Sequence, residues 1–198
     1  AETTVQQDPD NPDNQVARIE YTAGKYVNPW GPEFTLPENV EVSGSKLVYE
    51  VRIRFDGNDN TAKLTLHLTS KADNKSDWIW AAYSPNYYDT NILNRVGCIE
   101  LYRYDGASNT NTYWNGQIKK TDLGDGEFEY EKIQDGVLEE GTWYRIVTEI
   151  NTTNNQYIVK VCDDDYNVLR TTEELNSPDN VRDLHTFEDL SQGFKTAR

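Results

Sequence analysis

The sequence predicts an all-β fold, a two-sheet antiparallel β-sandwich of the jelly-roll type. Three observations predict it. Short segments with apolar side chains at every second position follow one another from about residue 16 to residue 172. Clusters of Gly, Asn and Asp separate these segments, as in 56–60 (DGNDN) and 151–155 (NTTNN). No helical periodicity lies between them, which disfavours a parallel sheet with crossover helices.

The clearest strand is 47–55, in which every second residue from Leu47 to Phe55 is apolar and three of the four residues between them are charged. One face of this strand is therefore expected in the core and the other in water. Further strands are predicted at 17–22, 62–69, 77–83, 97–104, 113–118, 127–134, 142–150, 156–162 and 166–172. Their spacing of roughly 10 to 15 residues is typical of two packed antiparallel sheets.

The two ends of the chain differ from the middle in composition. Residues 1–15 are rich in Asp, Asn, Gln and Pro, so we expect a linker or a disordered N-terminus there. Residues 16–175 form the predicted sandwich domain, and 176–198 form a C-terminal segment. Apolar residues recur in that last segment at helical spacing: Val181, Leu184, Phe187 and Leu190. A short helix packed on the sandwich is therefore expected.

Charge and composition narrow the classes of partner. Asp and Glu number 34 against 19 Lys and Arg, a net charge of -15 that repels phosphate backbones and anionic lipid head groups. We therefore expect neither nucleic acid nor a membrane as a partner. We also expect the protein to be a monomer. The first residues lack a basic region and an apolar core, so we expect a secreted protein whose export signal is already removed. Cys98 and Cys162 are predicted to be free thiols.

One hairpin carries a resemblance to known proteins. Residues 141–146 (GTWYRI), a polar turn around Asn151 and the segment 157–163 (YIVKVCD) resemble a hairpin of laminin-G-like and concanavalin-A-like jelly rolls. Many secreted carbohydrate-binding modules, lectins and polysaccharide-degrading enzymes share that hairpin. The resemblance implies a packing role for Trp143 and identifies an architecture better than a ligand.

The aromatic content points to a binding surface, since 13 Tyr and 5 Trp exceed what one core needs in so polar a chain. In the strand DWIWAAY, placing Ile79 and Ala81 in the core turns Trp78 and Trp80 to the opposite, outer face. The alternative is that both tryptophans are buried while Ile79 and Tyr83 are exposed.

The neighbouring strands add polar groups to the same outer face. If the leucines of the strand LTLHLT point inward, His67 points outward, and if the leucine face of 97–104 is core, Glu100, Tyr102 and Tyr104 point outward. Pyranose rings stack on aromatic rings, and their hydroxyls need fixed donors and acceptors. The predicted substrate-binding set on this sheet face is Trp78, Trp80, Tyr102, Tyr104, Glu100 and His67.

Two loop segments extend this set. Tyr87 and Tyr88 lie in the long loop 84–96, and Trp114 lies in the segment 109–115, which is rich in carboxamides. Loops at the rim of a sandwich often carry binding groups, so we expect one of the two segments to line the site. Turn chemistry alone also accounts for their Asn and Gly content.

A structural calcium ion is a further expectation. Acidic turns supply the oxygen ligands that Ca²⁺ prefers, and we name Asp163 and Asp165 as its first ligands, with backbone carbonyls completing the shell. Both follow the hairpin that carries the resemblance. The alternative is an ordinary turn at 163–167, favoured by its Asp and Asn content.

These observations together predict a non-catalytic carbohydrate-binding module, a secreted bacterial domain that holds an appended enzyme or a cell surface against a polysaccharide. An adhesin or spacer module without a glycan site is one alternative. A polysaccharide lyase is another, with Arg52 or Arg54 neutralising a uronate and with His67 and Tyr102 as base and acid.

A glycoside hydrolase is the last alternative. Glu127, Glu129 and Glu131 alternate along one strand, and their spacing resembles the Glu-x-Asp-x-Glu signature of jelly-roll β-glucanases, with Glu129 in place of the Asp. Paired carboxylates on one strand can serve as nucleophile and general acid. Charge on an edge strand explains the same pattern without catalysis.

Overall fold

The computed structural model describes residues 2–20, 34–35, 45–56, 63–72, 74–85, 99–104, 109–115, 117–134, 136–154, 156–172, 182–183, 190 and 192–197. Its strands are β1 (Glu2–Gln7), β2 (Gln15–Glu20), β3 (Phe34–Thr35), β4 (Lys46–Ile53), β5 (Lys63–Ser70), β6 (Ser76–Tyr83), β7 (Ile99–Tyr104), β8 (Asn109–Asn115), β9 (Gln117–Gly124), β10 (Glu127–Gln134), β11 (Tyr144–Asn151), β12 (Gln156–Cys162), β13 (Val168–Thr171), β14 (Arg182–Asp183) and β15 (Phe194–Ala197). None of the described residues belongs to a helix with the length and apolar character that a membrane crossing requires.

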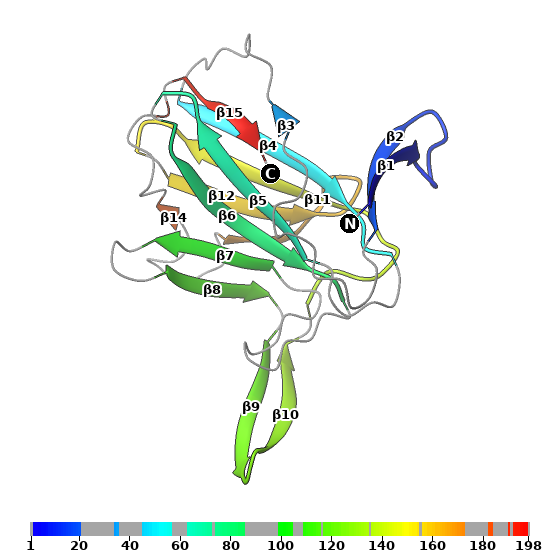
Figure 1. The fold of residues 1–198 in the computed structure, drawn as a ribbon, viewed down its shortest axis with the longest axis vertical. Helices are drawn as coiled ribbons and strands as arrows, with labels where there is room; N and C mark the ends of the chain where they lie inside the picture. The colour runs from blue at the N-terminus through cyan, green and yellow to red at the C-terminus, as the bar shows by residue number, and fades with distance from the viewer. Residues whose placement is uncertain are drawn as a thin grey trace.

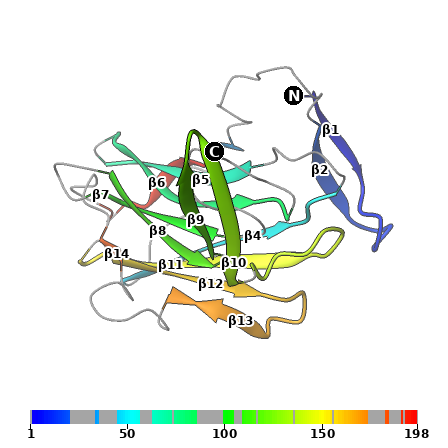
Figure 2. The same ribbon diagram turned by 90° about the horizontal axis from the view of Figure 1, so that it is seen from below.

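Two antiparallel sheets form the body of the molecule, which confirms the predicted all-β fold (Figure 1). The six-stranded sheet has the order β3-β15-β5-β6-β7-β8. The five-stranded sheet has the order β13-β12-β11-β4, with β14 also paired to β12. Seen from below, β5 and β6 lie in one layer and β4, β11 and β12 in the other (Figure 2).

Strict alternation builds the five-stranded sheet. β11 pairs without a register shift with β4 on one side and with β12 on the other. Along β11 every residue from Tyr144 to Ile150 alternates between buried and half-buried. The buried set faces the other sheet and includes Ile146 and Ile150, both fully buried. The sequence prediction for these three strands is confirmed, because each has one apolar face and one polar face.

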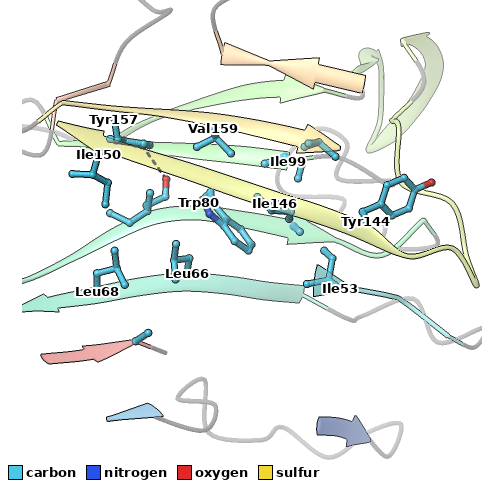
Figure 3. Close-up of a cluster of buried hydrophobic side chains, with 14 of the residues drawn as sticks. Ile53, Leu66, Leu68, Trp80, Ile99, Tyr144, Ile146, Ile150, Tyr157 and Val159 are labelled. Carbon is cyan, nitrogen blue, oxygen red and sulfur yellow. Dashed lines mark hydrogen bonds between the residues drawn. The ribbon is translucent and has the colours of Figure 1, made fainter. Parts of the chain in front are cut away.

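The core between the sheets is apolar (Figure 3). Two buried hydrogen bonds cross it, and Figure 3 shows the one made by Tyr157 as a dashed line. Trp80 Nε1 on β6 donates to Thr148 Oγ1 on β11 at 3.1 Å. Tyr157 on β12 donates its hydroxyl to the carbonyl of Ile79 on β6 at 3.0 Å. Each bond joins the two sheets and satisfies a polar group that water cannot reach, so it fixes how the layers face each other.

Two hairpins lie outside the sandwich (Figure 1). β9 and β10 pair with each other and project away from both sheets. β1 and β2 also pair with each other. The expectation of a disordered N-terminus at 1–15 is therefore wrong for the described residues of that segment, because Glu2–Gln7 is a strand and 8–14 form its turn. That the segment is a linker stays a prediction.

The predicted C-terminal helix is not formed where the segment is described. Arg182 and Asp183 form β14 and pair with Tyr157 and Gln156 of β12. Leu190 is buried in the core at 1% exposure, and β15 adds a strand to the six-stranded sheet. Val181, Leu184 and Phe187 lie outside the described residues. Residues 182–183 therefore pair with β12 and do not form the helix that the periodicity predicted.

Candidate functional site

Trp80 lies in the core, so the interpretation that placed it on a sugar-binding outer face is wrong. It is 1% exposed. The cause is a β-bulge: Leu66 pairs with Trp80, but the next residue, His67, pairs with Trp78, which leaves Ile79 as an extra residue in β6. Ile79 and Trp80 therefore both belong to the core, although they are adjacent in sequence.

The opposite face of β6 is also covered. Ala81 and Tyr83 are 0% exposed, and the Lys63 ammonium lies 5.3 Å from the centroid of the Tyr83 ring. The alternative orientation is right in burying Trp80 but wrong in exposing Ile79 and Tyr83. Because both faces of β6 are buried from Ile79 to Tyr83, this part of the strand offers no open platform on which a sugar ring could stack.

One end of the six-stranded sheet is formed by β7 and β8, where four of the nine predicted binding residues lie. The register places Ala81 of β6 opposite Glu100 of β7, and Glu100 opposite Tyr113 of β8. The next positions pair Tyr102 with Asn111 and Tyr104 with Asn109. The backbone thus brings three of the predicted residues, Glu100, Tyr102 and Tyr104, next to carboxamide-rich β8 at alternate positions of β7.

The remaining predicted binding residues are partly described. His67 is half-buried on β5, on the strand positions between the buried Leu66 and Leu68. The side chains of Trp78, Glu100, Tyr102, Tyr104 and Trp114 lie outside the described part of the structure, as do Tyr87 and Tyr88 entirely. For the first five of these residues the structure gives only the strand positions, in β6, β7 and β8.

The outward face of β4, β11 and β12 in the five-stranded sheet carries charge. Glu149 of β11 accepts hydrogen bonds from two lysines, from Lys46 of β4 at 2.7 Å and from Lys160 of β12 at 3.0 Å. Partial burial acts to raise the pKa of Glu149, but the two lysine hydrogen bonds outweigh it and the pKa lies below the usual value. The carboxylate is therefore ionised and held in one orientation by lysines from the two neighbouring strands.

A second charged cluster joins the N-terminal hairpin to this sheet. Arg52 of β4 donates to Asp8 Oδ2 at 2.6 Å and to Asp164 Oδ1 at 2.7 Å. Its guanidinium lies over the Trp143 ring, 4.1 Å from the centroid. Trp143 Nε1 in turn donates to Asp10 Oδ2 at 2.7 Å. The packing role that the resemblance implies for Trp143 stays a prediction, but in this structure its partners are charged side chains.

The carboxylates of this cluster are held ionised. The Asp10 backbone N–H is the main group that lowers the pKa of Asp8, with help from Asn14 and Arg52. Arg52 likewise lowers the pKa of Asp164. The Asp8 side chain is fully enclosed, so its charge depends on these partners. Sequence reasoning missed this cluster because 1–15 was interpreted as a linker.

Arg145 extends the cluster along the face. It donates to Glu50 Oε1 at 2.6 Å and stacks its guanidinium on the Tyr166 ring, 4.4 Å from the centroid. Tyr166 is 56% exposed and its hydroxyl contacts Glu50 at 3.1 Å. These side chains are hydrogen-bonded to one another. Such pairing is typical of a turn that is held against a sheet and not of an open catalytic centre.

The residues named for the lyase alternative are divided between the two sheets. Arg52 lies on β4 of the five-stranded sheet and Arg54 directly follows that strand, whereas His67 and Tyr102 lie on the six-stranded sheet. The glycoside hydrolase alternative stays a prediction. The strand with Glu127, Glu129 and Glu131 is β10, in the projecting hairpin. Its register places Glu131 opposite Lys119.

The turn that was named for calcium is held by its own hydrogen bonds. Asp163 Oδ1 accepts from the backbone N–H groups of Asp165 at 3.0 Å and of Asn167 at 2.8 Å, while Oδ2 accepts from Asn167 Nδ2 at 2.8 Å. The Asn167 bond is the main cause of a lowered pKa at Asp163. The described residues contain no group of three or more His, Cys, Asp and Glu side chains placed to hold a metal. Calcium binding at Asp163 and Asp165 stays a prediction.

Cys162 is a buried free thiol, as predicted, and burial raises its pKa. Cys98 lies outside the described residues. Comparison of the chain with protein-family models, with curated proteins and with solved structures finds no match. The function must therefore be argued from the arrangement of the residues.

Proposed function

We propose that the protein is a non-catalytic carbohydrate-binding module that holds a polysaccharide at the β7–β8 end of its six-stranded sheet. One observation carries the proposal: the register that sets Glu100, Tyr102 and Tyr104 beside the carboxamide-rich β8. Together the two strands hold four aromatic residues, a carboxylate and three Asn residues within 99–104 and 109–115. These residue types supply the stacking surface and the hydrogen-bonding groups that sugar rings need.

The interior supports the same location. The bulge removes Trp80 from the outer face, and β6 is buried at Trp80 and Ala82 on its core face and at Ala81 and Tyr83 on the opposite face. A ligand that approaches the six-stranded sheet would therefore meet β7 and β8, because β8 ends the sheet order. The edge of a sheet can accept a long chain polymer without a deep pocket.

The broader role follows from this function. In line with the resemblance of the hairpin 141–163, we place the protein among secreted bacterial modules that tether an appended enzyme or a cell surface to a polysaccharide. A binding module retains its ligand and leaves it intact, and this separates it from a lyase or a glycosidase on the same scaffold.

Affinity electrophoresis against about a dozen soluble neutral and acidic polysaccharides tests the proposal. We expect retarded migration with at least one of them, together with no release of reducing ends and no rise in absorbance near 235 nm after long incubation. Retention with cleavage would overturn the non-catalytic assignment. Normal migration in every gel would overturn the binding function itself and leave the adhesin or spacer alternative.

A further inference from the structure

A shallow depression of about 360 Å³ lies at one end of the five-stranded sheet. At this end β4 and β12 begin and β11 ends. Its polar lining comes from Ser45, Lys46, Glu149, Asn151 and Gln156. The register brings Asn151 opposite both Lys46 and Gln156, so three adjacent strands each contribute one of these side chains at the same level. The depression is on a different sheet from the β7–β8 surface.

The charged groups of the depression are already oriented. Lys46 and Lys160 hold the two oxygens of Glu149 at 2.7 and 3.0 Å. The Glu149 side chain is 20% exposed, so one side of the carboxylate still faces the depression. The consequence is a carboxylate in a fixed position, with acceptor capacity for a further donor.

The carboxamides are oriented as well. Asn151 Oδ1 accepts from the Thr153 backbone N–H at 2.9 Å, and Gln156 Oε1 accepts from Asn154 Nδ2 at 2.7 Å. Because the turn fixes both oxygen ends, the amide nitrogens of Asn151 and Gln156 are set as the donor ends. The depression thus combines a fixed acceptor, two carboxamides, an ammonium and a hydroxyl.

An apolar row borders these groups. Val48 of β4 and Ile158 of β12 lie opposite Glu149 on either side, and Val48 is 57% exposed. Aliphatic side chains beside a carboxylate match the alternation of C–H groups and hydroxyls on a sugar ring. The lining contains one cation and one anion, so it favours a ligand without net charge.

We propose that this depression is a second binding site, which takes one neutral mono- or disaccharide unit through Glu149, Lys46 and Asn151. Its volume of about 360 Å³ is at the lower end of small-molecule sites, which suits one or two rings and not a long chain. Glu149 accepts from sugar hydroxyls, and Lys46 and Asn151 donate to them. The site acts independently of the β7–β8 surface.

Titration of ¹⁵N-labelled full chain with glucose, galactose, mannose and N-acetylglucosamine, followed by NMR, tests the proposal. We expect saturable shifts of the Asn151 and Gln156 side-chain amides with at least one sugar at millimolar concentration. Glu149→Gln, which keeps the shape and loses the charge, should weaken that binding roughly tenfold. The matched control Glu140→Gln, an exposed glutamate outside the depression, should bind as the wild type does.

Three results would contradict the proposed site or its ligand class. Absence of shifts with all four sugars, or equal affinity in Glu149→Gln, would overturn the site. Saturable shifts with glycine but with none of the sugars would show a zwitterion site and overturn the ligand class. A double variant Tyr102→Ala/Tyr104→Ala separates the two proposals, because it should lose polysaccharide retention and keep the sugar shifts at Asn151. Thermal unfolding of each variant verifies that it is folded.

Discussion

Strand pairing differs between the two sheets, and this difference decides which side chains face water. β4, β11 and β12 pair residue by residue from end to end, whereas β5–β6 and β7–β8 each contain a register shift. In β4, β11 and β12 the alternation of the sequence correctly places the charged side chains on the outward face. In β6, Ile79 and Trp80 both lie in the core, and the strand is buried on both faces from Ile79 to Tyr83. An outward face can therefore be inferred from sequence only where pairing is uninterrupted.

The largest effect that follows from this difference is on stability at Trp80. Trp80→Ala should lower the free energy of unfolding by about 3–5 kcal/mol, because it leaves a large cavity and deprives Thr148 of its donor. Urea unfolding measures it. Trp80→Phe should cost less, since a ring still fills most of the space. Wild-type stability in Trp80→Ala would restore the interpretation of Trp80 as an outer-face residue.

The next effect concerns the cluster that fastens the N-terminal hairpin to the uninterrupted sheet. Arg52→Ala should lower the thermal midpoint by several degrees, because the enclosed carboxylate of Asp8 then has no cation. Arg54→Ala should lower it less, since its partners Asp10 and Asp56 are 56% and 55% exposed. Equal effects of the two variants would mean that enclosure of Asp8 contributes nothing.

Acid should weaken the charged side chains of the five-stranded side, this cluster included, before it affects the core. Asp8, Asp163, Asp164 and Glu149 all have pKa values below their usual range in the folded protein. Lowered folded pKa values contribute stability that is fully present above about pH 4–5, the range of unfolded carboxyls, and is lost as the pH falls through the folded values. Urea midpoints between pH 6 and pH 2.5 should therefore fall below about pH 4. In Arg52→Ala this acid loss should be smaller, and an unchanged loss would contradict the assignment.

The smallest effect is expected on the outward face itself. Val48→Thr keeps the branched side chain at a position that is 57% exposed, so the free energy of unfolding should change by less than about 0.5 kcal/mol. The same change at the enclosed Val159, which is 0% exposed, buries a hydroxyl and should cost clearly more. Urea unfolding of the pair compares the two faces of one sheet, and equal losses would contradict the alternation.

Most of the fold could be predicted because alternation is a local signal. The segments 47–55, 142–150 and 156–162 have one apolar and one polar face, and β4, β11 and β12 lie there. The strands β1, β3, β14 and β15 were not predicted. The first is polar, and the other three are short and are stabilised by partners far along the chain. The predicted strand 113–118 spans the end of β8 and the start of β9.

The candidate site could be predicted less well. No local pattern marks the bulge at Leu66 and His67, because a bulge depends on two strands at once. The Arg52–Asp8 pair joins residues 44 positions apart, so single-segment reasoning had no access to it. Arg52 and Arg54 both lie over the Trp143 ring. The sequence analysis assigned Trp143 a packing role through the family resemblance and therefore did not consider a charged partner for it.

The direct test of glycan binding at the β7–β8 end compares two sets of tyrosines in one gel. With a polysaccharide that retains the wild type, affinity electrophoresis should show retention reduced at least tenfold in Tyr102→Ala/Tyr104→Ala, because large aromatic contacts dominate such interfaces. Tyr166→Ala, which removes an exposed ring from the five-stranded side, should be retained like the wild type. Full retention of the double variant with loss in Tyr166→Ala would contradict the proposed location and move the binding surface to the other sheet.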